Sequence, residues 1–474
     1  MRDDIRFGTD GWRAVIAEQF TFENVRLVSN AIAAACHRLP QGMEVPAGID
    51  RNRLIVGYDR RFLSLEFARE VAFTLSRTGI DVLLSDAPTP SQTISFAVRH
   101  RRLLGGVVVT ASHNPAAYNG IKFKAWYGGS ALPEIYSLIA ESLGRDPERT
   151  GGGSVENVDL LGDYVTALRN SVDLDVIRDG ELRILHDPIH GAAAGLLKRV
   201  FGRRRHPVID TIRGEINPSF GGVNPEPIPE NLEASRKRMA KPGTRYHLAI
   251  CNDGDADRLG ILDERGEYVS PHKILSLLAL YLFRVRGVEG ELVKTFSTTR
   301  LIEKIAAALG VRLHETPIGF KYVADLMLTR NIAIGGEESG GIALGSFLPE
   351  RDGVLSGLLV AEAIAAYRKP LSQIIAEMEE EFGELHYDRR DLRRSEGACE
   401  RFLDQARNGG LDGAFEREVT SREEKDGIKL NLADGSWILF RKSGTEPMIR
   451  IYCESPSRER VQTMLDAAVE ELDR

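Results

Sequence analysis

The chain has 474 residues, which exceeds the roughly 250–300 residues that one hydrophobic core usually serves, so three or four domains are expected. Its formal net charge of −7 argues against a general nucleic-acid binder, because such proteins need a basic surface. The four cysteines are far apart, the first residues have no apolar signal-peptide core, and no apolar run is long enough to cross a bilayer. We therefore expect a cytoplasmic globular protein with neither nucleic-acid nor membrane partners.

Strand-like and helical patterns alternate along most of the chain. Helices are predicted at 21–39, 64–78, 91–100, 273–285, 299–309 and 353–367, and strands at 54–57, 81–84, 105–110, 182–185, 248–252, 291–295, 311–314 and 331–334. Residues 40–53 are predicted to form a loop. This alternation is typical of α/β domains. From about residue 382 short strands and helices mix, including a hairpin predicted at 427–432 and 436–440.

A small hydroxyl and a histidine follow one of these strands. The glycine-bounded run at 105–110 predicts a buried strand that ends just before Ser112 and His113. Asn114-Pro115 prevents a simple helical continuation. The pair therefore lies at the carboxyl end of a strand, where open α/β sheets place ligands. Taken alone, the pair fits an ordinary surface turn better.

Three carboxylates follow another predicted strand. Asp253, Asp255 and Asp257 alternate with small residues, and like charges this close repel one another unless a cation or solvent screens them. Hard oxygen ligands of this kind suit Mg²⁺ or Ca²⁺. An EF-hand is excluded, because Arg258 stands where that loop needs glycine and because strand-like segments flank the loop. The remaining alternative is an exposed acidic turn.

Two later loops carry groups suited to sugars and phosphates. Four glycines surround Glu337, Glu338 and Ser339, which predicts a loop able to grip polyhydroxyl groups. Arg441 and Lys442 precede Ser443 and Thr445, and such a loop can bind an anion through charge and backbone N–H groups. Each loop, considered alone, fits a surface turn as well.

The motifs together resemble those of the α-D-phosphohexomutase family, most closely the bacterial phosphoglucomutases/phosphomannomutases. Residues 110–115 (TASHNP), 253–258 (DGDADR), 336–340 (GEESG) and 441–447 (RKSGTEP) occur in the family's order, and residues 7–13 and 224–227 also match. The resemblance implies an α/β fold of three similar domains with mixed sheets between helices, a smaller C-terminal α+β domain, and an active site in the central cleft. The expected domains are 1–154, 155–266, 267–378 and 379–474, which carry the phosphoserine, metal, sugar-binding and phosphate-binding loops in turn.

The resemblance also implies a reaction and a set of roles. A phosphate on Ser112 would pass to a hexose 1-phosphate, giving a bisphosphate such as glucose 1,6-bisphosphate, which is also the activator. Return of the other phosphate to Ser112 would leave the hexose 6-phosphate. Mg²⁺ would be held by Asp253, Asp255, Asp257 and the phosphate of Ser112.

The remaining roles implied by the resemblance concern protons, the sugar and the phosphates. Lys122 and Lys321 are the candidates for proton transfer, and we expect a lowered pKa for them in a crowded cationic cleft. The resemblance implies that Arg13 and Arg258 contact the transferring phosphate, and that His113 either donates to that phosphate or is structural. The implied sugar contacts are Thr316, Gly319, Glu337 and Ser339. The implied contacts of the phosphate that is not reacting are Arg441, Ser443, Gly444 and Thr445.

The sugar and the assembly are less closely specified. Thr110 and the run Gly319-Phe320-Lys321 favour glucose, with mannose and glucosamine as alternatives. A serine-nucleophile phosphatase would share the nucleophile and the metal but would need no sugar grip. A non-catalytic sugar-phosphate sensor would have no need to keep Ser112, the aspartates and the lysines. The protein is expected to bind a small phosphosugar as a monomer or a homodimer.

Overall fold

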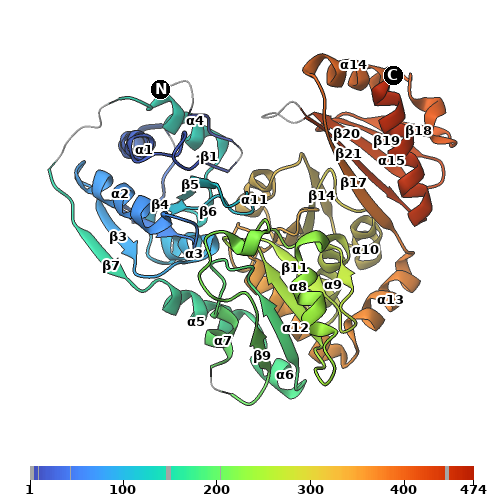
Figure 1. The fold of residues 1–474 in the computed structure, drawn as a ribbon, viewed down its shortest axis with the longest axis horizontal. Coiled ribbons are helices and arrows are strands. Elements are labelled where there is room, and N and C mark those ends of the chain that lie inside the picture. Colours follow the sequence, from blue (N-terminus) through green and yellow to red (C-terminus); the bar gives the residue numbers. More distant parts are fainter. Residues whose placement is uncertain (1–4, 9, 43, 146–150, 203, 443–447) are drawn as a thin grey trace.

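The computed structural model describes residues 5–8, 10–42, 44–145, 151–202, 204–442 and 448–474. Figure 1 shows four successive regions, each built on its own sheet, from blue at the N-terminus to red at the C-terminus. The first three sheets mix parallel and antiparallel strands and carry helices on their faces. The fourth sheet is antiparallel throughout. This architecture confirms the expected fold class.

The first sheet has the strand order β1-β5-β4-β2-β3-β7, with β6 beside β5. Its strands are β1 (Trp12–Val15), β2 (Asp50–Tyr58), β3 (Asp81–Ser85), β4 (Leu103–Val109), β5 (Tyr118–Ala125), β6 (Gly129–Ser130) and β7 (Val155–Val158). Its helices are α1 (Phe22–Gly42), α2 (Ser64–Ser76), α3 (Ser91–His100) and α4 (Pro133–Glu141). β7 pairs in parallel with β3, so the first sheet extends beyond residue 154.

The predicted loop at 40–53 is wrong at both ends. Helix α1 runs on to Gly42, and β2 already begins at Asp50. Asp50 pairs with Leu103 of β4, and Arg53 pairs with Asp81 of β3. Pairing with two neighbouring strands therefore outweighs the turn preference of the local residues.

The second sheet has the order β12-β11-β10-β8-β9. Its strands are β8 (Arg183–Asp187), β9 (Val208–Thr211), β10 (Leu248–Asn252), β11 (Leu259–Leu262) and β12 (Tyr268–Val269). The helices of this region are α5 (Leu161–Ser171), α6 (Leu174–Asp179), α7 (Leu196–Phe201), α8 (Glu233–Met239) and two short 3-10 turns, η1 (Phe220–Gly222) and η2 (Pro229–Asn231). Strands β10 and β11 flank the three aspartates, as expected when the EF-hand was excluded.

The third sheet has the order β14-β13-β15-β16. Its strands are β13 (Glu291–Thr295), β14 (Leu313–Thr316), β15 (Ile332–Gly336) and β16 (Ile342–Leu344). The helices are α9 (Pro271–Arg284), α10 (Leu301–Leu309), α11 (Phe320–Thr329), α12 (Gly353–Tyr367) and α13 (Leu371–Phe382). One continuous hydrophobic core joins Ile250 of β10, Leu358 of α12 and Ile334 of β15. The second and third sheets are thus packed into one body.

The fourth sheet has the order β17-β21-β20-β19-β18. Its strands are β17 (His386–Arg393), β18 (Val419–Glu423), β19 (Ile428–Leu432), β20 (Trp437–Lys442) and β21 (Met448–Ser455), with α14 (Glu396–Arg407), η3 (Asp412–Phe415) and α15 (Arg458–Asp473). β19 and β20 form the predicted hairpin. Trp437, Leu439 and Tyr452 pack around Phe296 of the third region, which joins the two regions. Among the described residues, no helix is both long and apolar enough to cross a membrane.

Candidate active site

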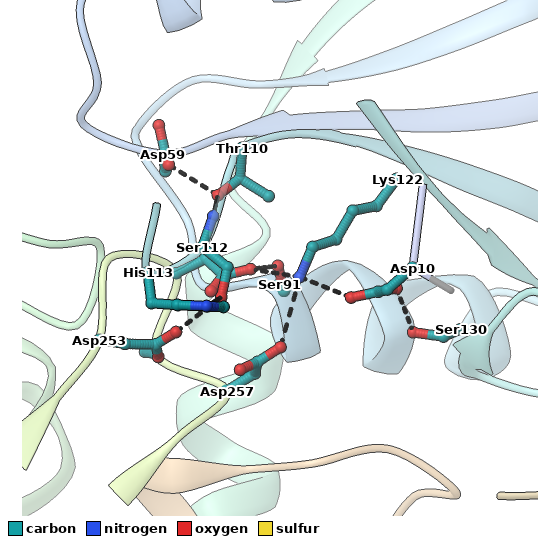
Figure 2. Close-up of polar contacts among 12 residues, drawn as sticks. Asp10, Asp59, Ser91, Thr110, Ser112, His113, Lys122, Ser130, Asp253 and Asp257 are labelled. Carbon is teal, nitrogen blue, oxygen red and sulfur yellow. Dashed lines mark hydrogen bonds and ion pairs between the residues drawn. The ribbon is translucent and has the colours of Figure 1, made fainter. Parts of the chain in front are cut away.

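Ser112 lies in a tight loop directly after β4. Its backbone φ of 52° is in the left-handed region, which a non-glycine residue adopts only when its surroundings hold it there. The Thr110 hydroxyl accepts a hydrogen bond from the Ser112 N–H at 2.9 Å and donates to an Asp59 carboxylate oxygen at 2.7 Å. The strand end and Asp59 therefore fix the turn that presents the serine (Figure 2).

A buried arginine holds the same turn from behind. Arg61 Nη2 donates to the carbonyl oxygens of Ser112 and Asn114, each at 2.6 Å. Its Nε lies 3.2 Å from an oxygen of Asp59. Neither Arg61 nor Asp59 was identified from the sequence as a site residue. The signal was a charged run directly after β2, which is the parallel neighbour of β4.

Asp253, Asp255 and Asp257 lie in what we call the acid loop, residues 253–258, between β10 and β11. All three side chains are fully buried, and one oxygen from each lies within 4.8 Å of the others. Asp255 Oδ1 and Asp257 Oδ1 have no hydrogen-bond partner among the described residues. Buried carboxylate oxygens without partners are costly, and a divalent cation would satisfy them. The donor set therefore fits Mg²⁺.

The acid loop lies directly against the serine. Ser112 Oγ donates to Asp253 Oδ2 at 2.8 Å, although 141 residues separate the two in sequence. A Cβ atom on Gly254 would lie 2.5 Å from the Ser112 carbonyl oxygen, so only glycine permits this approach. Figure 2 shows Ser112 facing Asp253, with the Asp257 carboxylate directed toward Lys122 beside them. The Ser112 hydroxyl and the three aspartates thus share one buried centre.

Lys122 joins this centre from β5. Its Nζ lies 2.8 Å from Asp10, 2.9 Å from Asp255 and 3.3 Å from Asp257. Burial disfavours the ammonium, but these three carboxylates outweigh it and raise the pKa of Lys122. The expectation of a lowered pKa is wrong for Lys122, because its neighbours are anions rather than cations.

The titratable groups around Ser112 are held in different states. Burial and the charges of Asp257 and Asp255 raise the pKa of Asp253 well above its usual value. Burial acts the same way on Asp255, but Lys122 outweighs it and lowers the pKa of that carboxyl. His113 Nδ1 lies 3.4 Å from Ser112 Oγ. Burial, together with Arg258 and Arg13, holds the pKa of His113 well below its usual range, so its imidazole is neutral.

Arg351 links the acid loop to the loop at 337–341, which we call the glutamate loop. Its guanidinium lies 2.8 Å from Asp257, 3.2 Å from Asp10 and 3.5 Å from Glu337. The ring of Phe320 lies 5.4 Å from the centre of that guanidinium. Arg351 and the pairing role of Asp10 were not predicted from the sequence. No local pattern joins residues that are 341 positions apart.

The glutamate loop packs beside the acid loop. The Leu259 N–H, directly after Arg258, donates to the Gly340 carbonyl oxygen at 3.0 Å. Glu337 is buried, and the burial raises the pKa of its carboxyl to about 7 despite the opposing charge of Arg351. Ser339 is partly exposed in the same loop. Glu337 and Ser339 therefore lie on the loop adjoining the three aspartates.

Two predicted phosphate contacts also lie at this centre. Arg258 Nη1 pairs with Glu226 at 2.7 Å, and its N–H donates to Asp253 Oδ1 at 3.0 Å. Arg13 Nη1 donates to Asn114 Oδ1 at 2.8 Å, in the loop of Ser112. The loop of Ser112 thus holds the Arg13 guanidinium, whereas Arg258 adjoins Asp253 through its backbone N–H and has its guanidinium held by Glu226.

Other predicted residues are not drawn into the Ser112 cluster. Lys321, at the start of α11, has its Nζ 5.0 Å from the Tyr322 ring, and no contact between it and Ser112 occurs among the described residues. Thr316 ends β14 and Gly319 precedes α11, so both belong to the segment leading to Lys321. Arg441 is the penultimate residue of β20, and its Nε donates to Asp426 Oδ1 at 2.9 Å. Ser443, Gly444 and Thr445 lie outside the described residues.

Four family models match the chain in order. They describe phosphoglucomutase/phosphomannomutase alpha/beta/alpha domains I, II and III, at residues 4–150, 162–266 and 270–382, and the C-terminal domain at 393–471. The matches cover most of the sequence. Each of the four falls on one of the four sheets described above.

Whole-length relatives agree with these matches. A phosphoglucomutase/phosphomannomutase of Thermococcus kodakarensis is 30% identical over 98% of this chain and 98% of its own. A phosphoglucosamine mutase of an Arthrobacter species is 30% identical over 98% and 97% of the two chains. A Thermus thermophilus structure described as a "putative phosphomannomutase" is 35% identical, with a TM-score of 0.86 over 99% of each chain. The chain therefore belongs to the phosphoglucomutase/phosphomannomutase family and is an intramolecular phosphotransferase of the isomerase class.

Proposed function

We propose that the protein interconverts hexose 1-phosphates and hexose 6-phosphates through a phosphate carried on Ser112, with glucose as the favoured sugar. The observation that supports this most strongly is the Ser112 hydroxyl, held 2.8 Å from Asp253 in a buried set of three carboxylates. Phosphoryl transfer depends on alignment and charge neutralisation more than on covalent chemistry. A fixed hydroxyl beside a cation site supplies both.

The proposed transfer begins with phosphorylated Ser112. The bond between phosphorus and Ser112 Oγ breaks as phosphorus bonds to O6 of a hexose 1-phosphate. The O6 hydroxyl gives up a proton and the departing serine oxygen takes one up, and Lys122 and Lys321 are our candidates for carrying these protons. The bisphosphate then turns over in the site, and its 1-phosphate returns to Ser112, which leaves the hexose 6-phosphate. Bound glucose 1,6-bisphosphate would phosphorylate the resting serine and so act as activator.

Mg²⁺ fits the acid loop because two of its buried carboxylate oxygens lack partners among the described residues. Asp253, Asp255 and Asp257, with an oxygen of the phosphate on Ser112, would hold it. The ion would supply positive charge that offsets the charge of the transferring phosphate. Arg258 and Arg13 are placed to add charge beside it, and neutral His113 is suited to a hydrogen bond with the serine phosphate.

Glu337 and Ser339 are our candidates for the sugar hydroxyls, with Thr316 and Gly319 along the segment leading to Lys321. Arg441, Ser443, Gly444 and Thr445 are our candidates for the phosphate that is not reacting. This division suits a substrate that binds in two orientations, because one grip recognises the sugar and the other accepts either phosphate.

Glucosamine is the second candidate sugar. A relative named phosphoglucosamine mutase is as similar to this chain as one named phosphoglucomutase/phosphomannomutase. The Thr110 hydroxyl is engaged with Asp59 and the Ser112 N–H, so Thr110 would influence the choice of sugar only indirectly, through the shape of the serine turn. Phe320 would likewise influence the choice of sugar indirectly, because its ring packs on Arg351, which pairs with Glu337.

A coupled assay tests the proposal. Purified protein receives Mg²⁺, catalytic glucose 1,6-bisphosphate and, in separate reactions, the 1-phosphates of glucose, mannose and glucosamine. We expect the 6-phosphate of each accepted sugar, with glucose the fastest, and no free phosphate. A highest rate with glucosamine would replace the sugar assignment. Release of free phosphate without isomerisation would identify a phosphatase instead of a mutase. If neither reaction occurs, the protein would be a non-catalytic sugar-phosphate sensor.

Glu337→Gln is expected to stabilise the protein above neutral pH while lowering its activity. The pKa of Glu337 rises from 4.5 to about 7 on folding, so the folded state holds its proton more tightly than the unfolded state. Stability from this group is therefore full below about pH 4.5 and falls as pH rises through 7, by on the order of 3 kcal/mol. The neutral amide escapes this loss, but it binds hydroxyls more weakly, and we expect kcat/KM to drop about 10- to 100-fold.

The measurement is thermal unfolding from pH 5 to pH 8, with Glu377→Gln as a control for loss of an exposed carboxylate. The advantage of Glu337→Gln over wild type should grow with pH, whereas the control should follow wild type. A constant difference across this range would show that Glu337 is ionised normally.

A further inference from the structure

One carboxylate in the turn between β18 and β19, that of Asp426, contacts a residue of the third region and another residue of the fourth. Asp426 Oδ1 accepts a hydrogen bond from Arg441 Nε at 2.9 Å. Its other oxygen, Oδ2, accepts from the backbone N–H of Ile318, also at 2.9 Å. Ile318 lies between Thr316 and Gly319, in the segment that leads to Lys321. Asp426 therefore bridges the end of β20 and the loop after β14.

The turn reaches this position because it ends in glycine. Gly427 has a φ of 96°, and a Cβ atom there would lie 2.2 Å from the Phe440 carbonyl oxygen and 3.1 Å from the Arg441 Cα. Any other residue would force the turn away from β20. The close fit places Asp426 beside the arginine and leaves its carboxylate little freedom.

The two hydrogen bonds determine how Arg441 is presented. A carboxylate on the Nε edge fixes the plane of a guanidinium and leaves the terminal nitrogens as the edge for a bound anion. Burial disfavours the charge of Arg441, but Asp426 outweighs it and raises the pKa of the guanidinium. The charge of Glu338, between the two candidate sugar ligands, acts on the same guanidinium. Arg441 is thus within electrostatic reach of the glutamate loop.

We propose that Asp426 is a positioning residue that orients Arg441 toward the phosphate that is not reacting and ties that orientation to the loop at 316–319. The inference rests on the proposed function, in which Arg441 holds this phosphate. Asp426 acts through Arg441 and Ile318 and does not itself touch the substrate. Because both phosphates of the bisphosphate occupy this grip in turn, the same residue serves both directions of the reaction.

The same turn offers a matched control. Lys425 Nζ pairs with Glu315 Oε1 at 2.7 Å, so it also joins the β18–β19 turn to the end of β14. Lys425→Met removes that link without touching Arg441 or Ile318. If the turn served only to dock the two regions, the two substitutions would have similar effects. If Asp426 orients Arg441, their effects differ.

The test is Asp426→Asn, an isosteric change whose amide NH2 must face one of the two N–H donors. We expect KM for glucose 1-phosphate to rise about tenfold, with kcat within about threefold, because a grip used equally in ground and transition states changes KM. Glucose 1,6-bisphosphate should weaken as an activator to a similar extent. Asp426→Glu should recover part of the loss, and Lys425→Met should match wild type.

A double-mutant cycle isolates the route of the effect. In an Arg441→Ala background, Asp426→Asn should cause no further rise in KM. An equal loss with and without Arg441, or equal effects of Asp426→Asn and Lys425→Met, would overturn the proposal. Calorimetric titration with inorganic phosphate distinguishes failure of the positioning role from failure of the proposed function. If wild type isomerises no hexose phosphate, weaker phosphate binding by Asp426→Asn than by Lys425→Met still supports the positioning role, and equal binding overturns it.

Discussion

Replacing Ser112 by alanine is expected to lower the rate of hexose phosphate isomerisation by at least about 10⁴-fold, because the Ser112 hydroxyl is the group proposed to carry the phosphate between the two ends of the sugar. Removal of the hydroxyl also ends its hydrogen bond to Asp253, but the backbone contacts of the turn with Arg61 and Thr110 remain. The variant should therefore fold as wild type does while losing turnover.

Two measurements check this result. The coupled assay gives the rate, and intact-mass spectrometry after incubation with glucose 1,6-bisphosphate gives the phosphate content. Wild type should gain one phosphate and Ser112→Ala none. Ser76→Ala is the control, because Ser76 is also buried in the first region but, among the described residues, donates only to the Phe73 carbonyl of its own helix. Phosphorylation or turnover retained in Ser112→Ala would assign the nucleophile elsewhere.

The second large effect is expected for Asp255→Asn, which should reduce Mg²⁺-dependent turnover by about 10³-fold or more. The change removes one of three negative charges proposed to hold the ion and puts an amide next to Lys122. Lys122 keeps its pairs with Asp10 and Asp257, so the buried ammonium stays compensated and the fold should survive.

Calorimetric titration with Mg²⁺ and activity as a function of Mg²⁺ concentration provide the readouts. Both should show weakened binding in Asp255→Asn with an unchanged circular dichroism spectrum. Asp210→Asn serves as the matched control, because Asp210 of β9 lies in the sheet that carries the acid loop and pairs with Arg183 and Tyr246 instead of with the loop. Turnover at the wild-type level in Asp255→Asn would remove the aspartates from the mechanism.

Much of the fold could be predicted because local pattern and tertiary environment agree. The helix at 91–100, the strands at 248–252 and 291–295, and the helix at 353–367 match α3, β10, β13 and α12 to the residue. In each of these runs the apolar spacing or the residue content favours the type of element that the structure shows. The start of β2 was missed because Asp50 and Asn52 favour a turn, and only pairing with neighbouring strands keeps them extended.

The site could be predicted as far as its motifs extend. Ser112 and the three aspartates were recognised separately, and the structure brings them into one centre. Arg61 and Arg351 were missed because their partners are distant carbonyls and carboxylates that no local spacing reveals. The pKa of Lys122 was predicted in the wrong direction for the same reason. The sequence shows how many charges a cleft contains, but not which sign lies closest to a given amine.

The continuous core between the second and third sheets has a mechanical consequence. Close-packed interiors resist deformation, so the acid loop and the glutamate loop, one from each sheet, are carried on a single rigid body. Their spacing is set by the buried side chains of that core, so we expect it to be the same with and without a bound ligand. If a hinge motion admits and turns the substrate, we expect it at the flanks of that body, where the serine loop and the C-terminal sheet meet it.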